Sequence, residues 1–261
     1  MSDRLLAGAH AAYFLDIDGT LVELAQTPGA VRIGAALLEV IEALARRTGG
    51  AVALISGRAL PDIDQLFPRR RLAAAGQHGI ERRSAAGAVT RHRVSAATLN
   101  RVRRVLSTAL IGQGLLLEDK GQSLALHYRQ APRQAGVAHR TMRRMLALAG
   151  PRYVLQRGKW VIELKPAGRD KGMAIAEFMR EPPFLGRTPI FVGDDATDEQ
   201  GFAVVNRMGG CSVKVGPGPT AAGWRLPDAR AVVAWLASGR SPQAPVRVRR
   251  PSAARRQRPR E

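Results

Sequence analysis

The chain has 261 residues, 45% of them hydrophobic and 24% charged, which is enough for one large folded domain or two small ones and excludes global disorder. No stretch reaches the roughly 18 consecutive apolar residues that a transmembrane helix needs, so we expect no membrane contact. The net charge of +20 comes from 36 Arg and 5 Lys against 21 acidic residues. Aromatic residues make up only 5% of the chain and do not interleave with the Arg clusters, so this charge does not favour nucleic-acid binding.

A strand–helix alternation opens the chain. Residues 11–16 form a short apolar run that ends on an acid, which is typical of a buried parallel strand. Further apolar strands are expected at residues 51–55 and 72–75. A helix is expected at residues 34–48, where leucine and isoleucine recur at helical spacing before two glycines, and a shorter one at residues 60–67. This order predicts an α/β fold with a doubly wound, Rossmann-like parallel sheet flanked by helices.

From about residue 80 the pattern changes to hairpins and two longer helices. Helices are expected at residues 96–111 and 134–148. Strands are expected at residues 88–94, 115–118, 123–128, 153–156 and 160–164. Because the earlier alternation resumes afterwards, we expect residues 80–165 to be an inserted α+β cap domain, and residues 1–79 and 166–240 to form the core.

The last third of the chain returns to alternating helices and strands. The expected helices are 171–180, 198–208 and 228–236, and the expected strands are 189–192 and 211–215. The strand at 211–215 begins with Cys211, the single cysteine, for which we expect a buried, unreactive thiol. Residues 241–261 are rich in Pro, Arg and Ser without periodicity and are expected to form a basic, disordered tail.

The cysteine and lysine usage adds two expectations. A single cysteine excludes an intramolecular disulfide and a cysteine-based zinc site. Residues 5–15 do not form a convincing secretory leader, and together with the low cysteine content this indicates a cytoplasmic protein. Arg outnumbers Lys seven to one, so a lysine is expected where a compact ammonium group is needed. Four of the five lysines lie in the middle third of the chain, namely Lys120, Lys159, Lys165 and Lys171.

Acidic and polar clusters follow three of the predicted core strands. They are Asp16-Ile17-Asp18-Gly19, Ser56-Gly57-Arg58 and Gly193-Asp194-Asp195. In open α/β sheets ligands bind at the carboxyl ends of the strands, so these clusters should converge there. An acid that ends an apolar strand is costly unless it is paired or bound to metal. Several carboxylates together suit a hard divalent cation, and Mg²⁺ is the cation that best combines carboxylate and phosphate ligands.

The spacing of these residues indicates phosphoryl chemistry. Residues two apart in an extended segment point the same way, so Asp16 and Asp18 can face one reacting group, one as a nucleophile and one as an acid/base. Gly19 allows close approach to a phosphate. The hydroxyl group of Ser56 can donate to phosphate oxygens, and the ammonium group of Lys171 can bind the phosphate and balance Asp16.

These motifs carry a family resemblance. The run Asp-Ile-Asp-Gly-Thr-Leu that starts at Asp16 resembles the first motif of the haloacid-dehalogenase-like phosphatases. Ser56, Lys171 and residues 193–198 are similar to the second, third and fourth motifs, in the family's order. The four motifs together are highly specific, whereas the first alone would be only moderately so.

The resemblance implies a role for each acid. Asp16 would attack phosphorus and bind Mg²⁺. Asp18 would protonate the leaving oxygen and then activate water, while its backbone carbonyl group also binds the metal. Asp194 would be the remaining protein ligand of the metal, and Asp195 and Asp198 would support the site.

Within that superfamily, stretches of the insert and its flanks resemble the trehalose-6-phosphate phosphatases. These stretches are residues 54–58, 75–79, 118–121, 124–129 and 158–166. The resemblance spans roughly residues 10–240 and implies that Glu118, Lys120 and Glu163 bind the sugar. Carboxylates suit that task because they accept strong hydrogen bonds from hydroxyl groups.

The resemblance therefore implies an Mg²⁺-dependent phosphatase that hydrolyses trehalose 6-phosphate in trehalose biosynthesis. Separately, we expect the protein to be a monomer. One alternative is another sugar phosphatase of the superfamily, for sucrose phosphate or related to the phosphomannomutases, since the core motifs alone do not exclude it. A second alternative is a nucleic-acid-associated basic protein. A non-catalytic binding module is disfavoured because Asp16, Asp18, Lys171 and Asp194 are all present.

Overall fold

A computed structural model describes residues 10–68, 71–92, 95–110 and 113–238 of the chain. The expected tail at residues 241–261 and the start of the apolar segment at residues 5–15 lie outside these described residues. None of the helices within the described part is both long enough and apolar enough to cross a membrane.

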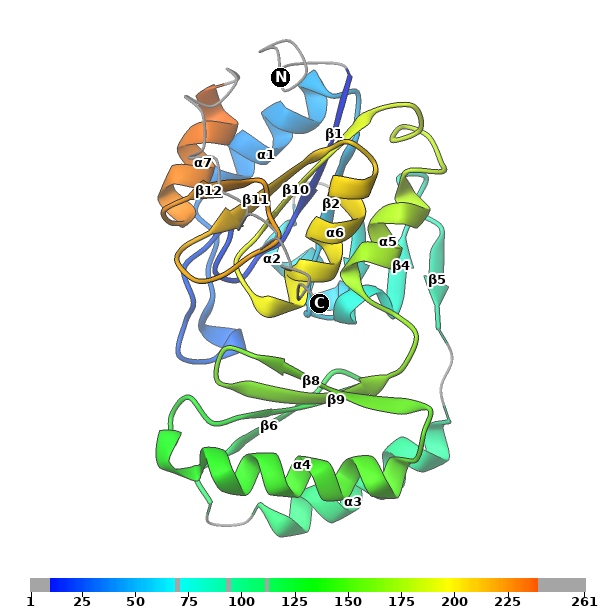
Figure 1. The fold of residues 1–261 in the computed structure, drawn as a ribbon, viewed down its shortest axis with the longest axis vertical. Helices are drawn as coiled ribbons and strands as arrows, with labels where there is room; N and C mark the ends of the chain where they lie inside the picture. Colours follow the sequence, from blue (N-terminus) through cyan, green and yellow to red (C-terminus); the bar gives the residue numbers. More distant parts are fainter. Residues whose placement is uncertain (1–9, 69–70, 93–94, 111–112, 239–261) are drawn as a thin grey trace, which may run out of the picture.

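The described residues form two separate β-sheets (Figure 1). The larger has the order β12-β11-β10-β1-β2-β3-β4-β5, and its pairs are parallel from β12 to β3. Its parallel strands are β1 (Ala11–Leu15), β2 (Val52–Ile55), β3 (Ala73–Gly76), β10 (Thr188–Gly193), β11 (Cys211–Val215) and β12 (Trp224–Leu226). The antiparallel hairpin of β4 (Glu81–Arg83) and β5 (Val89–Arg91) extends its edge. The expected Rossmann-like α/β sheet is confirmed.

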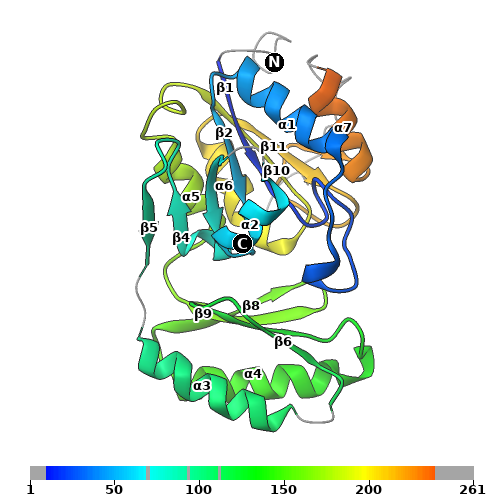
Figure 2. The same cartoon turned by 180° about the vertical axis from the view of Figure 1, so that it is seen from behind.

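Helices cover both faces of this sheet because its central strands are apolar on both sides. On β1, Tyr13 and Leu15 pack among α1 (Ala35–Arg47), α2 (Leu60–Leu66) and α7 (Ala229–Ser238). The alternate residues Ala12 and Phe14 pack against α5 (Lys171–Phe178) and α6 (Glu199–Arg207). Figures 1 and 2 show these two layers on opposite sides of the sheet.

The smaller sheet is antiparallel, with the order β6-β7-β9-β8. Its strands are β6 (Leu116–Asp119), β7 (Leu124–His127), β8 (Tyr153–Gly158) and β9 (Val161–Pro166). Two helices, α3 (Ala96–Ala109) and α4 (Ala135–Ala149), pack on one face through a separate apolar cluster that includes Val102, Leu126 and Met142. The other face of this sheet lies toward the larger sheet (Figures 1 and 2).

Two short strands were not expected from the sequence, β4 and β12. Both are three residues long and carry charged or mixed side chains, so they lack the apolar pattern that marks a strand. The strand expected near residues 88–94 was placed with the inserted unit, but β5 pairs with β4 in the larger sheet. A hairpin has the same local pattern whichever sheet it joins.

The division into a core and an inserted cap domain stays a prediction.

Candidate active site

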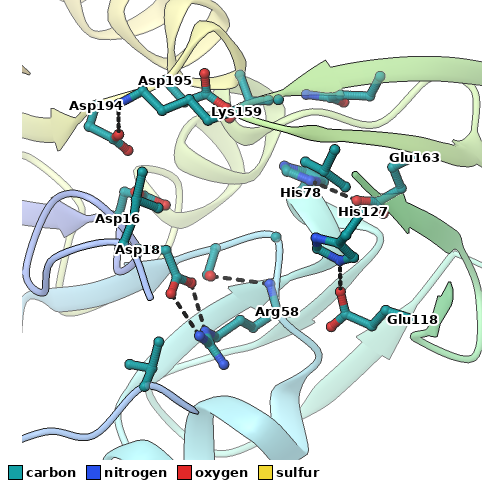
Figure 3. Close-up of a pocket in the computed structure, with 18 of the residues that line it drawn as sticks. Asp16, Asp18, Arg58, His78, Glu118, His127, Lys159, Glu163, Asp194 and Asp195 are labelled. Atoms are coloured by element: carbon teal, nitrogen blue, oxygen red, sulfur yellow. Dashed lines mark hydrogen bonds and ion pairs between the residues drawn. The ribbon is translucent and has the colours of Figure 1, made fainter. Parts of the chain in front are cut away.

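Three neighbouring strands of the larger sheet end at one cavity, which has a volume of about 930 Å³ including its open mouth. The strands β10, β1 and β2 are adjacent, so the residues that follow them meet at the carboxyl edge of the sheet. The smaller sheet supplies the opposite wall (Figure 3). The expected site residues that line the cavity are Asp16, Asp18, Ser56, Glu118, Lys120, Glu163, Lys171, Asp194 and Asp195.

Asp16 is buried directly after β1, with both carboxylate oxygens hydrogen-bonded. The ammonium group of Lys171 donates to Oδ1 at 2.7 Å, and the hydroxyl group of Thr20 donates to Oδ2 at 3.0 Å. Burial raises the pKa of Asp16 against the effect of Lys171, and the carboxylate of Asp198 raises it further. The two donors fix the orientation of the carboxylate toward the cavity.

Lys171 opens α5 and is also buried. Its ammonium group donates to Asp198 at 2.6 Å as well as to Asp16. Burial alone would lower the pKa of Lys171, but the carboxylates of Asp16 and Asp198 raise it above its ordinary value. The lysine therefore stays charged and can balance an anion at the end of β1.

A cluster of three buried carboxylates forms the candidate metal centre. One oxygen each from Asp16, Asp194 and Asp198 lies within 4.8 Å of the others. Burial and the carboxylate of Asp198 raise the pKa of Asp194 against the opposing effect of Lys159. Buried, oxygen-only donors of this kind fit a hard divalent cation such as Mg²⁺.

Gly19 makes room for a neighbouring carboxylate, a role that its sequence motif did not predict. Its φ of +84° favours glycine, and a Cβ atom there would lie 2.2 Å from Oδ2 of Asp194. The missing side chain therefore makes room for the carboxylate of Asp194. Its expected approach to a phosphate stays a prediction.

Asp18 pairs with an arginine for which we predicted no role. The guanidinium group of Arg58 donates to both carboxylate oxygens of Asp18, at 2.6 Å and 2.7 Å (Figure 3). Such a two-point contact fixes the carboxylate in one plane. The signal was in the sequence, because Arg58 follows Ser56-Gly57 at the end of a core strand.

Ser56 connects the end of β2 to a strained turn. Its hydroxyl oxygen accepts from the backbone N–H group of Arg58 at 3.1 Å, and its carbonyl oxygen accepts from that of His78 at 2.9 Å. Gln77 and His78 both have positive φ, 48° and 58°, a conformation that non-glycine residues adopt at a cost. A Cβ atom on Gly57 would lie 2.8 Å from the imidazole ring of His78, so this glycine admits the ring to the cavity wall.

On the wall formed by the smaller sheet, the expected sugar-binding residues form a charged network. Lys120 donates to Glu163 at 3.0 Å, and Glu163 also contacts His78 at 3.3 Å. Glu118 contacts His127 at 2.7 Å. Although burial opposes it, Lys120 and His78 hold the pKa of Glu163 well below its ordinary value. Glu163 is therefore ionised. Lys120 is charged as well, because the carboxylates of Glu163 and Glu118 raise the pKa of Lys120 although burial opposes this.

A second lysine crosses from the smaller sheet to the acidic cluster. Lys159, in the turn between β8 and β9, donates to Oδ2 of Asp194 at 2.6 Å (Figure 3). The scarcity of lysine and the family resemblance of residues 158–166 pointed to this residue, but neither predicted its contact with Asp194.

The two remaining acids stabilise the backbone of the site. Asp195 begins the short 3₁₀ helix Ala196–Asp198, where its side chain accepts from the backbone N–H group of Ala196 at 2.7 Å. Asp198 is fully buried, accepts from the backbone N–H group of Asp195 at 2.8 Å and binds Lys171. This reciprocal capping fits the supporting role expected for both.

Comparisons with known proteins agree with this geometry. The sequence model of the trehalose-phosphatase family matches residues 14–230. The trehalose-6-phosphate phosphatase of Escherichia coli K12 is 45% identical to this chain, over 87% of this chain and 86% of its own length. A probable trehalose-phosphate phosphatase of Sinorhizobium fredii is also 45% identical, over 79% of this chain and 78% of its own length.

Solved structures show the same fold. The C-terminal domain of the Candida albicans trehalose-6-phosphate phosphatase aligns with a TM-score of 0.80 at 20% identity, covering 92% of this chain and 97% of that domain. A trehalose-6-phosphate phosphatase related protein aligns with a TM-score of 0.73 at 26% identity, over 86% of this chain and 95% of its own. With its motifs brought together at one cavity and the family match spanning most of its length, the chain belongs to the trehalose-phosphatase family.

Proposed function

We propose that this chain hydrolyses trehalose 6-phosphate to trehalose and inorganic phosphate, with Mg²⁺, as a step of trehalose biosynthesis. The observation that carries the proposal is the two-sided cavity. One end holds the buried pair Asp16–Lys171, which suits a phosphate group, and the other holds the polar residues of the smaller sheet, which suit sugar hydroxyl groups. The names of the 45% identical relatives support this choice of sugar. The monomeric state and the cytoplasmic location stay predictions.

In the first chemical step the carboxylate of Asp16 attacks phosphorus. The new bond from Oδ to phosphorus forms as the bond from phosphorus to the sugar oxygen breaks, and a proton from Asp18 goes to that oxygen. Lys171 balances the charge on Asp16 and on the transferred phosphoryl group. The product of the step is trehalose and an aspartyl phosphate.

In the second step Asp18 takes a proton from water, and the oxygen of that water bonds to phosphorus as the bond from phosphorus to Oδ of Asp16 breaks. This releases inorganic phosphate and regenerates the carboxylate of Asp16. In this structure Asp18 is held by Arg58, so its carboxylate must leave that contact to reach the leaving oxygen. We infer that substrate binding in the cavity moves Asp18 away from Arg58.

Asp16 and Asp194, two of the three clustered acids, would hold Mg²⁺, and the family resemblance adds the backbone carbonyl group of Asp18. The third acid, Asp198, binds Lys171. When bound, the cation supplies positive charge that stabilises the phosphoryl group as it is transferred. The glutamates of the smaller sheet, Glu118 and Glu163, would accept hydrogen bonds from sugar hydroxyl groups, and Lys120 would donate to a sugar oxygen.

Phosphate release from a panel of sugar phosphates in Mg²⁺ tests the proposal. The panel contains trehalose 6-phosphate, sucrose 6-phosphate, mannose 6-phosphate, mannose 1-phosphate and glucose 6-phosphate. We expect the highest kcat/KM for trehalose 6-phosphate, with trehalose and phosphate formed in equal amounts. A higher kcat/KM for any other member would assign the chain to a different sugar phosphate.

A further inference from the structure

The turn between β8 and β9 reaches from the smaller sheet into the acidic cluster (Figure 3). It consists of Lys159 and Trp160, and the ammonium group of Lys159 lies 2.6 Å from Oδ2 of Asp194. The side chain of Asp194 is only 3% exposed, whereas that of Lys159 is 46% exposed. The ion pair therefore joins a buried carboxylate to a cation at the mouth of the cavity.

The backbone of this turn is fitted to the contact. Trp160 has a φ of +63°, in the left-handed region, and its ring packs edge-on against Tyr128 with the centroids 6.0 Å apart. A Cβ atom on Gly158 would lie 3.0 Å from the carboxylate of Asp195, so the strand comes close to the loop after β10. A strained residue persists only where its surroundings hold it, and strained residues concentrate at functional sites.

Charge balance gives Lys159 a distinct position in the cluster. Of the three clustered carboxylates, Lys171 donates to those of Asp16 and Asp198, and Lys159 donates to that of Asp194. Lys214 donates to the backbone carbonyl oxygen of Asp194 and not to its carboxylate. Lys159 thus provides for Asp194 the positive charge that a divalent cation on Asp194 would also provide. A divalent cation bound to Oδ2 of Asp194 and the ammonium group of Lys159 on that same oxygen would repel each other strongly.

We propose that Lys159 exchanges partners during the reaction cycle. It holds Asp194 while the site is free of cation, gives up that carboxylate when the cation binds, and then pairs with the phosphate dianion of the substrate. This inference rests on the proposed function only in taking a phosphate monoester as the substrate. By linkage, Lys159 opposes cation binding when phosphate is absent and favours phosphate binding when the cation is present.

Two calorimetric titrations test the exchange. In the first, Mg²⁺ is titrated into metal-free enzyme without phosphate, and Lys159→Met should bind Mg²⁺ about tenfold more tightly than the wild type. In the second, inorganic phosphate is titrated into Mg²⁺-saturated enzyme, and Lys159→Met should bind it at least about tenfold more weakly. Lys159→Arg keeps the charge and should stay near the wild type in the first titration and recover most of the phosphate affinity in the second.

Arg157→Met is the matched control, because Arg157 is exposed on β8, two residues before Lys159, and the variant loses the same single charge. It should change neither affinity by more than about twofold, since an exposed charge is largely screened by salt. Unchanged or weaker Mg²⁺ binding by Lys159→Met would overturn the proposal. So would unchanged phosphate binding, or equal effects of Lys159→Met and Arg157→Met. Neither titration contains trehalose 6-phosphate, so a failure here is distinct from a failure of the sugar assignment.

Discussion

At the scale of single residues, the chemistry depends on Asp16, whose two oxygens are held by Lys171 and Thr20. Asp16→Asn keeps the shape of the side chain, but an amide cannot form the phosphoenzyme. We expect kcat for phosphate release to fall by several orders of magnitude, as when one member of a catalytic unit is removed, while the far-UV circular dichroism spectrum is unchanged. Retention of a tenth of the wild-type rate would rule out the covalent mechanism.

The buried network around Glu163 makes a prediction about pH. The pKa of Glu163 is held well below its ordinary value near 4.5 by Lys120 and His78 despite burial, so its ionised form stabilises the fold. That contribution is complete above the unfolded-state pKa and is lost as the pH falls through the lower, folded-state pKa. Glu163→Gln should therefore lower the free energy of unfolding at pH 7, by an amount that shrinks below about pH 4.5.

Urea unfolding followed from pH 7 to pH 3 measures this dependence. Glu23→Gln is the control, because the side chain of Glu23 is 73% exposed and its pair with Arg230 is long, at 3.6 Å. The control should track the wild type at every pH. A pH-independent loss in Glu163→Gln would mean that the ionisation of Glu163 contributes nothing.

The lysines show how far single residues could be predicted. All five donate hydrogen bonds in or beside the site, and three of them, Lys120, Lys159 and Lys171, bind carboxylates. Their scarcity in an Arg-rich chain indicated that their positions matter. It could not name the partner of Lys159, because Asp194 lies 35 residues away and only the folded hairpin brings the two together.

At the scale of elements, β1 decides both the core and the site. Phe14 is fully buried, with its ring centroid 5.5 Å from that of Phe184 and 6.0 Å from that of Phe178. Phe14→Ala should cost about 3–5 kcal/mol in the free energy of unfolding measured in urea, because the cavity it leaves cannot collapse between strands and α5. Val89→Ala, on the exposed strand β5, should stay within about 0.5 kcal/mol. Equal losses in the free energy of unfolding for the two variants would mean that Phe14 does not lie in the core.

Strands and helices with a strong apolar pattern were predicted within a few residues, as with β1, α1 and β11. The strands β4 and β12 were not, because their pairing depends on neighbours distant in the sequence and not on their own side chains. The same limit applies to Arg58 and His78. Both lie in recognisable motifs. The contact of Arg58 with Asp18 forms only because the ends of β2 and β1 are adjacent, and the contact of His78 with Glu163 forms only where the smaller sheet meets the larger one.

At the scale of the whole molecule, the two sheets meet at a cavity whose acidic cluster is the candidate metal centre. Treatment with EDTA should abolish phosphate release, and Mg²⁺ should restore it, because the phosphate and the carboxylates together need a divalent cation. Asp194→Asn should raise the Mg²⁺ concentration needed for half-maximal activity. Full activity in the presence of the chelator would exclude the cation from the reaction.

In the proposed function, the larger sheet performs the chemistry and the smaller sheet selects the sugar. The direct test is the ratio of kcat/KM for trehalose 6-phosphate to kcat/KM for a small aryl phosphate, compared between the wild type and Glu118→Gln. Glu118 lines the cavity on β6, far along the chain from Asp16. We predict that the ratio falls about tenfold or more, because one carboxylate oxygen becomes an amide donor and the charge that strengthens hydrogen bonds from the sugar is removed, while the phosphate site is intact. Equal losses for both substrates, or no loss for either, would contradict the account.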